Sequence, residues 1–446
     1  MKKLVALLMA AMMLLASVAM AEAPEGYPEV VPGIDLGGAT IYILDYWSGD
    51  GARAAEPTEE QQAQYDYRDW IMATYNCTII QKQGGDWGTC AEEMINFVSA
   101  PDGSLRAYII EPGKVGSLVS NGVAAPITYD ISGEKWNAAN IGMWTMAGVP
   151  YGFSTGSHEP RQCLYFNKRV LEEAGIDWNT IYDMQAEGTW TWDVFEGMLK
   201  QIQKDVDNDG IIDIWGMTGD NNDLFNMAVA TNGGTYFDFD ADGNLQPTMG
   251  SEATLQGLNW GRYIWQTYFY QQPEGGNWDY YKEAWKTGFY GFYMYQTYGG
   301  FNDNSEMADM EDEWGCVAFP VPNAGDKYVT GVSENTYLIP NVYTEEQVNN
   351  IMFIIDLWTN PTPGYDDEDA WIGNKYNYTD DRAVDETYAM LRQGDAGWIN
   401  LVVLLGTSND VLGSSLLWSM GASTPAELIE AGMPAWQALC DAFNAK

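Results

Sequence analysis

Short apolar runs alternate with amphipathic stretches along most of this chain. The runs at 39–44, 78–80 and 107–110 are rich in β-branched and aromatic residues, which is typical of strands. Apolar residues at helical spacing dominate several of the segments that lie between and after these runs. Strands that alternate with helices in this way predict an α/β architecture with mainly parallel sheets.

Several later segments carry signals for the start of a helix. Asn167 and Thr191 each precede apolar residues at helical spacing. Thr344 and Thr424 are each followed three residues later by Gln or Glu, which is the spacing of a capping box. Pro434 lies inside the last of these segments, and we expect it to break or kink that helix.

The first 21 residues have the pattern of a signal peptide. Lys2 and Lys3 precede an apolar run from Leu4 to Ala16, and Ala19-Met20-Ala21 supplies the small residues that a signal peptidase needs. The run is shorter than the roughly 18 apolar residues that span a bilayer, and no later stretch reaches that length. We therefore expect an exported protein, in a periplasm, outside the cell or at its surface.

Length and charge narrow the class further. The chain has 446 residues, whereas one hydrophobic core stops growing at roughly 250–300 residues, so two lobes are expected. The apolar content of 46% suffices for packed cores. The formal net charge of −42 argues against nucleic acid or an anionic membrane surface as a partner. Solubility outside the cytoplasm is the simplest explanation of this charge.

Cysteine and histidine usage limits the chemistry. Five cysteines are present, none in a C-x-x-C pair, and the odd number leaves at least one unpaired. Cys77 and Cys90 form the preferred bridge if there is one, and free buried thiols are the equal alternative. His158 is the only histidine, which argues against histidine metal sites and against Ser-His-Asp or Cys-His catalysis.

Segment 164–177, LYFNKRVLEEAGID, resembles an element of the bacterial extracellular solute-binding proteins, in the large sugar-binding family that serves ABC importers. Other elements of that family follow in the expected order, at 148–153, 191–195, 205–216, 231–234, 319–322 and 423–427. Together they extend the resemblance over most of the chain that follows the signal peptide.

The resemblance implies a two-lobed, periplasmic-binding-protein-like fold of type II. Each lobe would hold a mainly parallel sheet flanked by helices, with the ligand cleft between the lobes. The first lobe would comprise residues 24–152 and 329–378, and the second residues 153–328 and 379–446. The implied function is that of the extracytoplasmic substrate-binding component of an ABC importer. It would be a monomer that binds a carbohydrate, with an oligosaccharide favoured, delivers it to permease subunits, and catalyses no reaction.

Two features depart from the family pattern. Many exported binding proteins of single-membrane bacteria carry a lipid on a cysteine after the signal peptide, but here Ala21 is followed by Glu22. Without this lipobox cysteine, we expect the protein to be confined by a second membrane, retained by its permease, or released. The aromatic stretch 289–295 replaces a pattern of small residues, which bears on the identity of the ligand.

Aromatic side chains are the first candidates for ligand contact, because flat rings stack on the C–H faces of sugars. Trp47 follows the first predicted strand, and Tyr151 lies near the first crossing between lobes. Tyr298 matches the region where the family often presents a stacking aromatic ring. Core packing is the alternative role for each of the three.

Carboxylates and amides are the second group of candidates, because they bind pairs of sugar hydroxyls. Asp45 and Glu111 end predicted strands, where open α/β sheets place their ligands. Glu334 and Asn335 resemble the segment that re-enters the first lobe beside the cleft. Asp223, in a segment 220–223 interpreted as a loop, is a weaker candidate. Helix capping or plain surface exposure is the alternative role for these residues.

The segment 205–213 resembles part of a calcium loop. Asp205, Asp207 and Asp209 alternate, Gly210 permits a sharp turn, and Asp213 falls at the ninth position. The twelfth position is Gly216, so the usual bidentate glutamate is missing. A structural calcium ion is therefore predicted only if another segment donates oxygen, and no cofactor is required. The predicted ligands are Asp205, Asp207, Asp209, Ile211 and Asp213.

Two other classes of function remain open at this stage. A secreted carbohydrate-active enzyme, such as a glycosidase or a lyase, would also use abundant Asp, Glu and Trp, and a glycosidase needs two carboxylates across one bond. A sugar-sensing or adhesion protein at the cell surface could use the same fold without transport.

Overall fold

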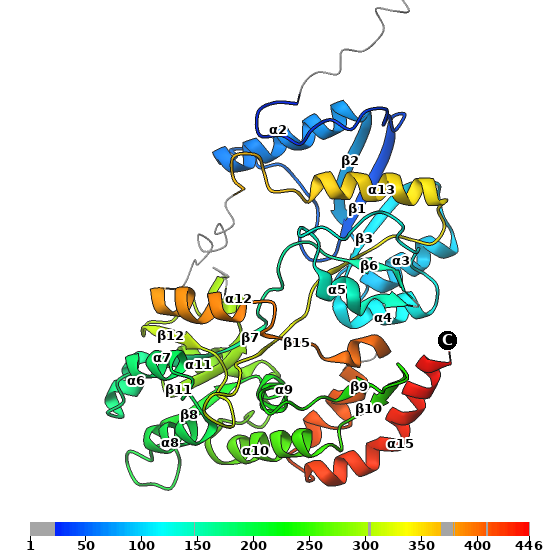
Figure 1. The fold of residues 1–446 in the computed structure, drawn as a ribbon. Coiled ribbons are helices and arrows are strands. Elements are labelled where there is room, and N and C mark those ends of the chain that lie inside the picture. The colour runs from blue at the N-terminus through cyan, green and yellow to red at the C-terminus, as the bar shows by residue number, and fades with distance from the viewer. Residues whose placement is uncertain are drawn as a thin grey trace, which may run out of the picture.

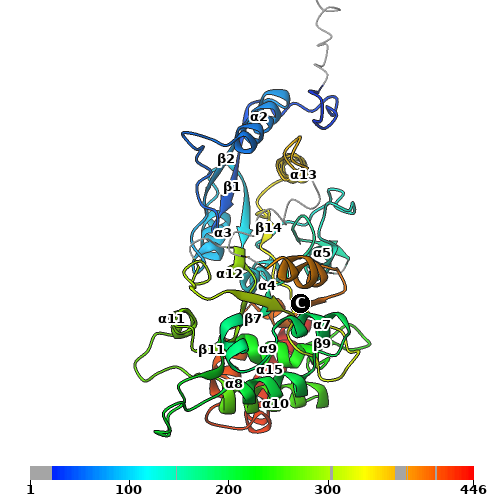
Figure 2. The same ribbon diagram turned by 90° about the vertical axis from the view of Figure 1, so that its left-hand side faces the viewer.

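The computed structural model describes residues 23–146, 148–301, 305–366, 378, 380–406 and 409–445. The predicted signal peptide, residues 1–21, lies outside these ranges. Two lobes lie one above the other, and chain segments cross between them (Figure 1). The view turned by 90° shows the same division (Figure 2). No helix within the described ranges combines the length and the apolar character needed to cross a membrane.

The first lobe is built on a five-stranded sheet of order β2-β1-β3-β14-β6. Its strands are β1 (Ala39–Asp45), β2 (Cys77–Gln83), β3 (Leu105–Ile110), β14 (Thr336–Leu338) and β6 (Gly152–Phe153). β1 pairs in parallel with β2 and β3, as predicted, whereas β14 runs antiparallel to both β3 and β6.

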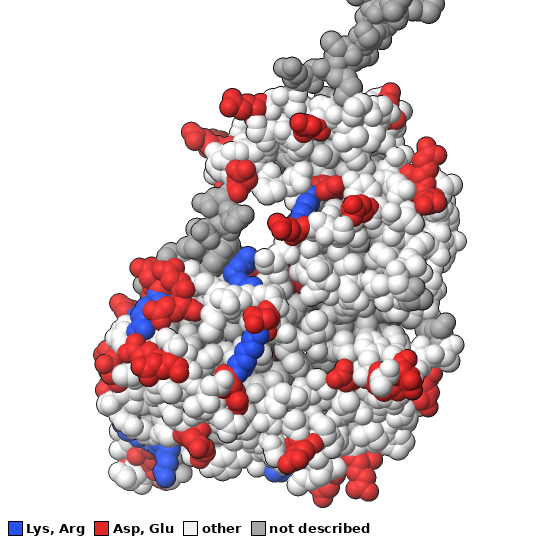
Figure 3. Space-filling model, viewed as in Figure 1, with Lys and Arg blue, Asp and Glu red and all other residues white. Residues whose placement is uncertain are grey.

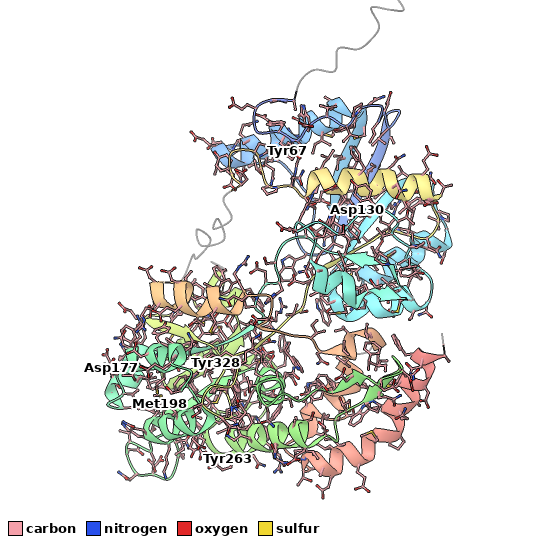
Figure 4. The ribbon with its side chains drawn as sticks, viewed as in Figure 1. Tyr67, Asp130, Asp177, Met198, Tyr263 and Tyr328 are labelled. Carbon is pink, nitrogen blue, oxygen red and sulfur yellow. The ribbon has the colours of Figure 1, made fainter. Side chains whose placement is uncertain are left out.

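Helices cover both faces of the first sheet. The helices of this lobe are α2 (Glu59–Thr74), α3 (Cys90–Ser99), α4 (Pro112–Ser120), α5 (Ala138–Met143) and α13 (Glu345–Trp358). A short hairpin, β4 (Thr145–Met146) with β5 (Val149–Pro150), follows α5. α2 and α13 share one core, in which the Tyr67 hydroxyl of α2 donates to the Leu357 carbonyl at 3.0 Å (Figure 4).

The second lobe is built on a four-stranded sheet of order β12-β7-β11-β8. Its strands are β7 (Gln162–Asn167), β8 (Trp215–Gly219), β11 (Tyr290–Gln296) and β12 (Trp314–Val317). Only β11 and β8 are parallel, and β7 is antiparallel to both of its neighbours. The prediction of a mainly parallel sheet is therefore wrong in detail for this lobe.

The crossing segments explain these antiparallel strands. Gln162, at the start of β7, pairs with Gln296 at the end of β11, and Thr336, at the start of β14, pairs with Ile110 at the end of β3. A segment that arrives from the other lobe enters a sheet at the edge where its parallel strands end. It must then run against them.

Helices and short strands complete the second lobe. Its helices are α6 (Lys168–Glu173), α7 (Asn179–Ala186), α8 (Trp192–Ile202), α9 (Asn221–Thr231), α10 (Glu252–Tyr268), α11 (Tyr280–Lys286), α12 (Tyr298–Phe301), η2 (Ala383–Tyr388), α14 (Ala389–Leu391), η3 (Leu401–Leu405), η4 (Asn409–Ser414), η5 (Leu417–Ser419) and α15 (Pro425–Asn444). Its short strands are β9 (Phe237–Phe239), β10 (Leu245–Pro247), β13 (Thr330–Gly331) and β15 (Gly397–Trp398).

Helix caps follow the sequence signals closely. Asn167 caps α6, and Thr344 and Thr424 form capping boxes at the starts of α13 and α15. α15 continues through Pro434, so the helix does not break there, and of the two predicted outcomes only a kink stays a prediction. Pro434 lies on the exposed side of the helix, where water can bind the freed carbonyl, while Trp436 and other buried residues anchor the opposite side.

The described strands of the first sheet come from residues 39–153 and 336–338, and those of the second from 162–317. The discontinuous division of the chain is thus visible in the sheets. The boundaries proposed above, 24–152 with 329–378 and 153–328 with 379–446, stay a prediction.

The five cysteines are free, buried thiols. Cys77 belongs to the core beneath α2 and α13, whereas Cys90 faces the core on the opposite side of the first sheet. The preferred Cys77–Cys90 bridge is therefore not formed, and the alternative of free thiols describes the structure.

Candidate functional site

A cleft with a cavity volume of about 360 Å³ lies where the two lobes meet. The first lobe and the crossing segments contribute Trp87, Glu111, Pro112, Asn140, Met143, Trp144, Arg161, Ser333 and Glu334. The second lobe contributes Gln162, Asn222, Asn226, Gln296, Trp398, Asn400, Val402, Val403, Leu412, Leu417 and Trp418, among others. The cleft is the strongest candidate site because both lobes supply its walls.

The carboxyl ends of strands from both lobes open on this cleft, as they do at ligand sites in other α/β sheets. β3 ends one residue before Glu111, which is the N-cap residue of α4. β8 ends at Gly219, and α9 begins two residues later with Asn221. Gly219 has φ +143° and lies against the backbone of Met294, so a side chain there would collide with β11. This glycine allows the sharp turn that brings the first turn of α9 to the cleft.

Buried polar atoms in the cleft wall lack hydrogen-bond partners among the described residues. They are Asn140 Oδ1, Trp144 Nε1, Asn222 Oδ1 and Gln296 Oε1. Nearly all buried polar atoms in proteins are paired, because leaving one unpaired costs about 1–3 kcal/mol. All four atoms belong to residues that line one cavity, so a polar ligand that draws these side chains toward it would supply the missing partners.

Among the described residues, three charged side chains line the same cavity: Glu111, Arg161 and Glu334. Burial raises the pKa of the Glu111 and Glu334 carboxyls, and Arg161 acts against this rise at both. The Glu159 amide donates to the Glu334 carboxylate at 2.9 Å, which holds this side chain at the crossing.

Hydrogen bonds connect the cavity wall to a buried acid behind it. Gln162 Nε2 donates to Asp223 Oδ1, and the Gly331 amide donates to Gln162 Oε1, each at 2.9 Å. Burial, together with the nearby Asp220 carboxylate, raises the pKa of Asp223 to about 7. Gln162 therefore links a buried acid in α9 to the segment that leads into the second crossing.

Exposed aromatic rings flank the polar wall. Trp87 precedes α3 and is 53% exposed, and Trp418 of η5 is 58% exposed. The Lys114 ammonium lies 4.4 Å from the centre of a Trp87 ring. Trp398 is half-buried and donates from Nε1 to the Gly234 carbonyl at 3.1 Å. Each lobe thus offers an accessible indole face to the cleft.

Three of the predicted site residues lie at the cleft. Glu111 and Glu334 line it, and Asp223 lies behind Gln162. The segment 220–223 is the cap and first turn of a helix, not a loop, because the Asp220 side chain accepts from the Asn222 amide.

The other predicted residues are not among those that line the cavity. Asp45 accepts from the Trp47 and Ser48 amides and so stabilises the turn after β1, while Trp47 is 68% exposed. Asn335 accepts from the Tyr46 hydroxyl at 2.6 Å.

The two predicted tyrosines are also held in place by protein contacts. Tyr151 packs against the apolar core shared by the two lobes. The Tyr298 hydroxyl lies 2.8 Å from that of Tyr295, and the Arg161 guanidinium lies 5.5 Å from the centre of the Tyr298 ring. Tyr298 therefore stands beside a cleft residue without lining the cavity itself.

Sequence reasoning missed Arg161, Gln296, Trp87 and Trp418. Gln296 ends the aromatic strand β11, so the rule applied to Asp45 and Glu111 would have found it. Trp87 lies in an irregular segment and Trp418 in the short 3₁₀ helix η5, and no local pattern separates them from the other 17 tryptophans.

The acidic loop after α8 keeps its carboxylates together. Ligand atoms of Asp205, Asp207 and Asp209 lie within 4.8 Å of one another. Asp213 instead accepts from the Val206 amide at 2.7 Å, and Ile211 is 67% exposed. Amides of the loop itself also donate to these carboxylates. The structural calcium ion stays a prediction.

Comparison with known proteins identifies relatives of this fold. The family model of the bacterial extracellular solute-binding proteins matches residues 78–345. No curated protein matches the chain significantly in sequence.

Solved structures match nearly the whole chain. An ABC substrate-binding protein from Listeria monocytogenes in complex with cycloalternan is 14% identical, with a TM-score of 0.60, 90% of this chain covered and 98% of that one. The cyclic α-maltosyl-1,6-maltose binding protein from Arthrobacter globiformis is 15% identical, with a TM-score of 0.63 and coverage of 91% and 100%. UgpB from Mycobacterium tuberculosis in complex with glycerophosphocholine is 13% identical, with a TM-score of 0.61 and coverage of 91% and 99%. These similarities confirm the predicted two-lobed α/β fold.

Proposed function

Because the chain belongs to the bacterial extracellular solute-binding protein family, we propose that it is the extracytoplasmic substrate-binding component of an ABC importer for a carbohydrate. An oligosaccharide is the favoured ligand. The expected partners are this carbohydrate and the permease subunits in the membrane, and the expected state is a monomer exported from the cytoplasm.

One observation carries this proposal. The residues that line the cleft include side chains with unpartnered polar atoms, among them Asn140 Oδ1 and Gln296 Oε1, and the indoles of Trp87 and Trp418, which are each more than half exposed. A sugar ring has hydroxyls around its edge and C–H groups on its faces, so it satisfies both kinds of surface at once. A purely apolar ligand would leave the polar atoms unpaired.

The names of similar structures support a carbohydrate without deciding it. One of them is in complex with cycloalternan and one is named for cyclic α-maltosyl-1,6-maltose, whereas a third is in complex with glycerophosphocholine. Since the fold accommodates both kinds of ligand, the assignment depends on the residues of this cleft.

The proposed mechanism is closure of two lobes around the ligand. Glu111 belongs to the first lobe, Asn222 to the second, and Glu334 to a crossing segment. A ligand that bonds to all three stabilises only the arrangement in which the lobes approach each other. No covalent step is needed, so we propose that the protein is not an enzyme.

Thermal unfolding with a panel of saccharides tests this proposal. Maltotriose, mannotriose, cellotriose and larger oligomers are added in excess, and at least one is expected to raise the melting temperature by about 5 °C, without turnover. The double variant Asn222→Ala/Gln296→Ala should lose this shift. Asn259→Ala, on the exposed side of α10, should keep it. Hydrolysis or elimination products in the same samples would instead show a carbohydrate-active enzyme.

A further inference from the structure

The charges around the cleft limit the kind of carbohydrate that it accepts. Only one of the three charged side chains that line the described cavity is a cation, Arg161, and its charge opposes the rise that burial causes in the pKa of Glu111, Glu334 and the buried Asp223. The two other charged side chains of the cavity wall, Glu111 and Glu334, thus already compensate the charge of the guanidinium.

Two further cations near the cleft are also engaged. Arg392, whose charge reaches Glu334, pairs with Glu159. Lys114 lies over the Trp87 ring at 4.4 Å, and its charge opposes the rise that burial causes in the pKa of the neighbouring Glu111. A ligand anion would have to compete with Glu111 for this ammonium while remaining close to the carboxylate itself.

Acids stand at the starts of two described helices that open on the cleft. Asp220 caps α9 and accepts from the Asn222 amide at 2.8 Å, whereas Glu111 is the N-cap residue of α4 without a capping hydrogen bond from its side chain. Amides at a helix N-terminus bind anions well, but here a protein carboxylate already occupies the start of α9 and another stands at the start of α4.

The surrounding surface strengthens this effect. Acidic side chains are spread over both lobes on the face shown in Figure 3, and basic ones are few. The formal net charge of the chain is −42. A negative field over a cleft of low dielectric raises the local concentration of cations and lowers that of anions.

We propose, on the basis of the carbohydrate function proposed above, that the cleft takes uncharged or amino-bearing saccharides and rejects those with carboxylate, phosphate or sulfate groups. An anionic group would enter beside Glu111 and Glu334 without a free counter-charge. An ammonium group, in contrast, would be attracted by the same carboxylates. Like charges forced together in this way typically reduce affinity by more than about tenfold.

Matched saccharides test this selectivity. Maltotriose and cellotriose are compared with the uronic acid trimers of the same linkage, and cellotriose also with chitotriose, which carries an amino group on each ring. We expect the uronic acid trimers to bind at least about tenfold more weakly than their neutral counterparts, and chitotriose to bind no more weakly than cellotriose. A uronic acid trimer that binds as tightly as its neutral counterpart would overturn the inference.

A second measurement reports the cleft charge without any saccharide. Quenching of tryptophan fluorescence by iodide and by neutral acrylamide is compared at constant ionic strength, with Trp87→Phe and Trp418→Phe used to isolate the cleft signal. Trp278 is the control, because it is 73% exposed and is not among the residues that line the cleft. Its signal is isolated in the same way with Trp278→Phe. The ratio of iodide quenching to acrylamide quenching should be much lower for the cleft indoles than for Trp278. The double variant Glu111→Gln/Glu334→Gln should abolish this difference. The control Glu60→Gln should leave it unchanged.

The two measurements separate the two proposals. If no saccharide binds but the cleft indoles remain shielded from iodide, the carbohydrate function is wrong and the charge selectivity stands. If iodide quenches the cleft indoles as readily as Trp278, or if an anionic trimer binds preferentially, the charge selectivity is wrong. The carbohydrate function then stands as long as a saccharide raises the melting temperature.

Discussion

Gly116 of α4 lies directly against the backbone of Leu404 in η3. A Cβ atom at Gly116 would stand 2.5 Å from the carbonyl oxygens of Leu404 and Val403. Around this contact, Leu118 and Val119 of the first lobe share one buried cluster with Val402 and Leu404. The absence of a side chain at residue 116 thus permits a close apolar contact between the lobes beside the cleft.

Substitution of Gly116 is expected to weaken closure. Gly116→Val should reduce saccharide affinity at least about tenfold and lower the free energy of unfolding by about 1–3 kcal/mol, because backbone atoms cannot move aside as a flexible side chain would. Calorimetric titration and urea unfolding measure the two effects.

The matched control for this variant is Gly197→Ala in α8, where an added Cβ would contact nothing within 4 Å. It should leave affinity unchanged. Unaltered affinity in Gly116→Val would show that the contact does not contribute to closure.

Loss of either exposed cleft indole should weaken binding without unfolding the protein. Trp87→Ala and Trp418→Ala each remove a ring that lies more than half exposed, so the apolar core loses little. We expect affinity to fall about tenfold for each variant, since ring stacking contributes roughly 0.5–1.5 kcal/mol beyond the buried area. Titration with the best saccharide of the thermal panel measures this loss, and Trp278→Ala should bind normally.

Substitution of Asn222, whose side-chain oxygen has no partner, should weaken ligand binding without lowering the stability of the free protein. Removal of an unpaired buried polar atom relieves a desolvation penalty, so Asn222→Ala should leave the melting temperature of the free protein unchanged or higher, while it weakens binding. Asn226 offers the comparison, because its Oδ1 accepts from the Tyr236 hydroxyl at 3.0 Å. Asn226→Ala should lower the melting temperature, and equal stability losses in the two variants would contradict the argument.

Because of Asp223, the free energy of unfolding should fall as pH rises from about 4 to about 7. Burial and Asp220 raise its pKa to about 7 from the ordinary 3.8. Between these values the folded state keeps a proton that the unfolded state releases, so the free energy of unfolding falls as pH increases. Asp223→Asn removes this dependence. Urea unfolding at pH 4.5 and 8 should show the variant gaining stability relative to the original protein at the higher pH.

A surface acid with the opposite shift provides the control. Asp130, labelled in Figure 4, has a lowered pKa because the Ser132 hydroxyl and amide donate to its carboxylate. Its contribution is present above the ordinary pKa and is lost as pH falls, so Asp130→Asn should cost stability at neutral pH. Parallel pH profiles for the two variants would refute the assignment to Asp223.

Local signals in the sequence determined much of the fold. The apolar runs at 39–44 and 107–110 are strands β1 and β3, and Thr344 caps α13 where the capping-box spacing predicted it. Glu111 was found because the residue after a strand lies at the edge where α/β sheets bind ligands. Such features depend on neighbours only a few residues away, so periodicity and propensity suffice to reveal them.

The tertiary structure alone decided which of these features meet. Arg161, Gln296 and Trp418 reach the cleft from separate segments of the chain. Asp45 does not reach it, because its carboxylate accepts from the backbone amide of Trp47 in the turn after β1. Likewise, β7 runs antiparallel because it enters its sheet from the other lobe. Contacts between residues more than a hundred positions apart depend on how two lobes pack, and no short-range pattern in the sequence records that packing.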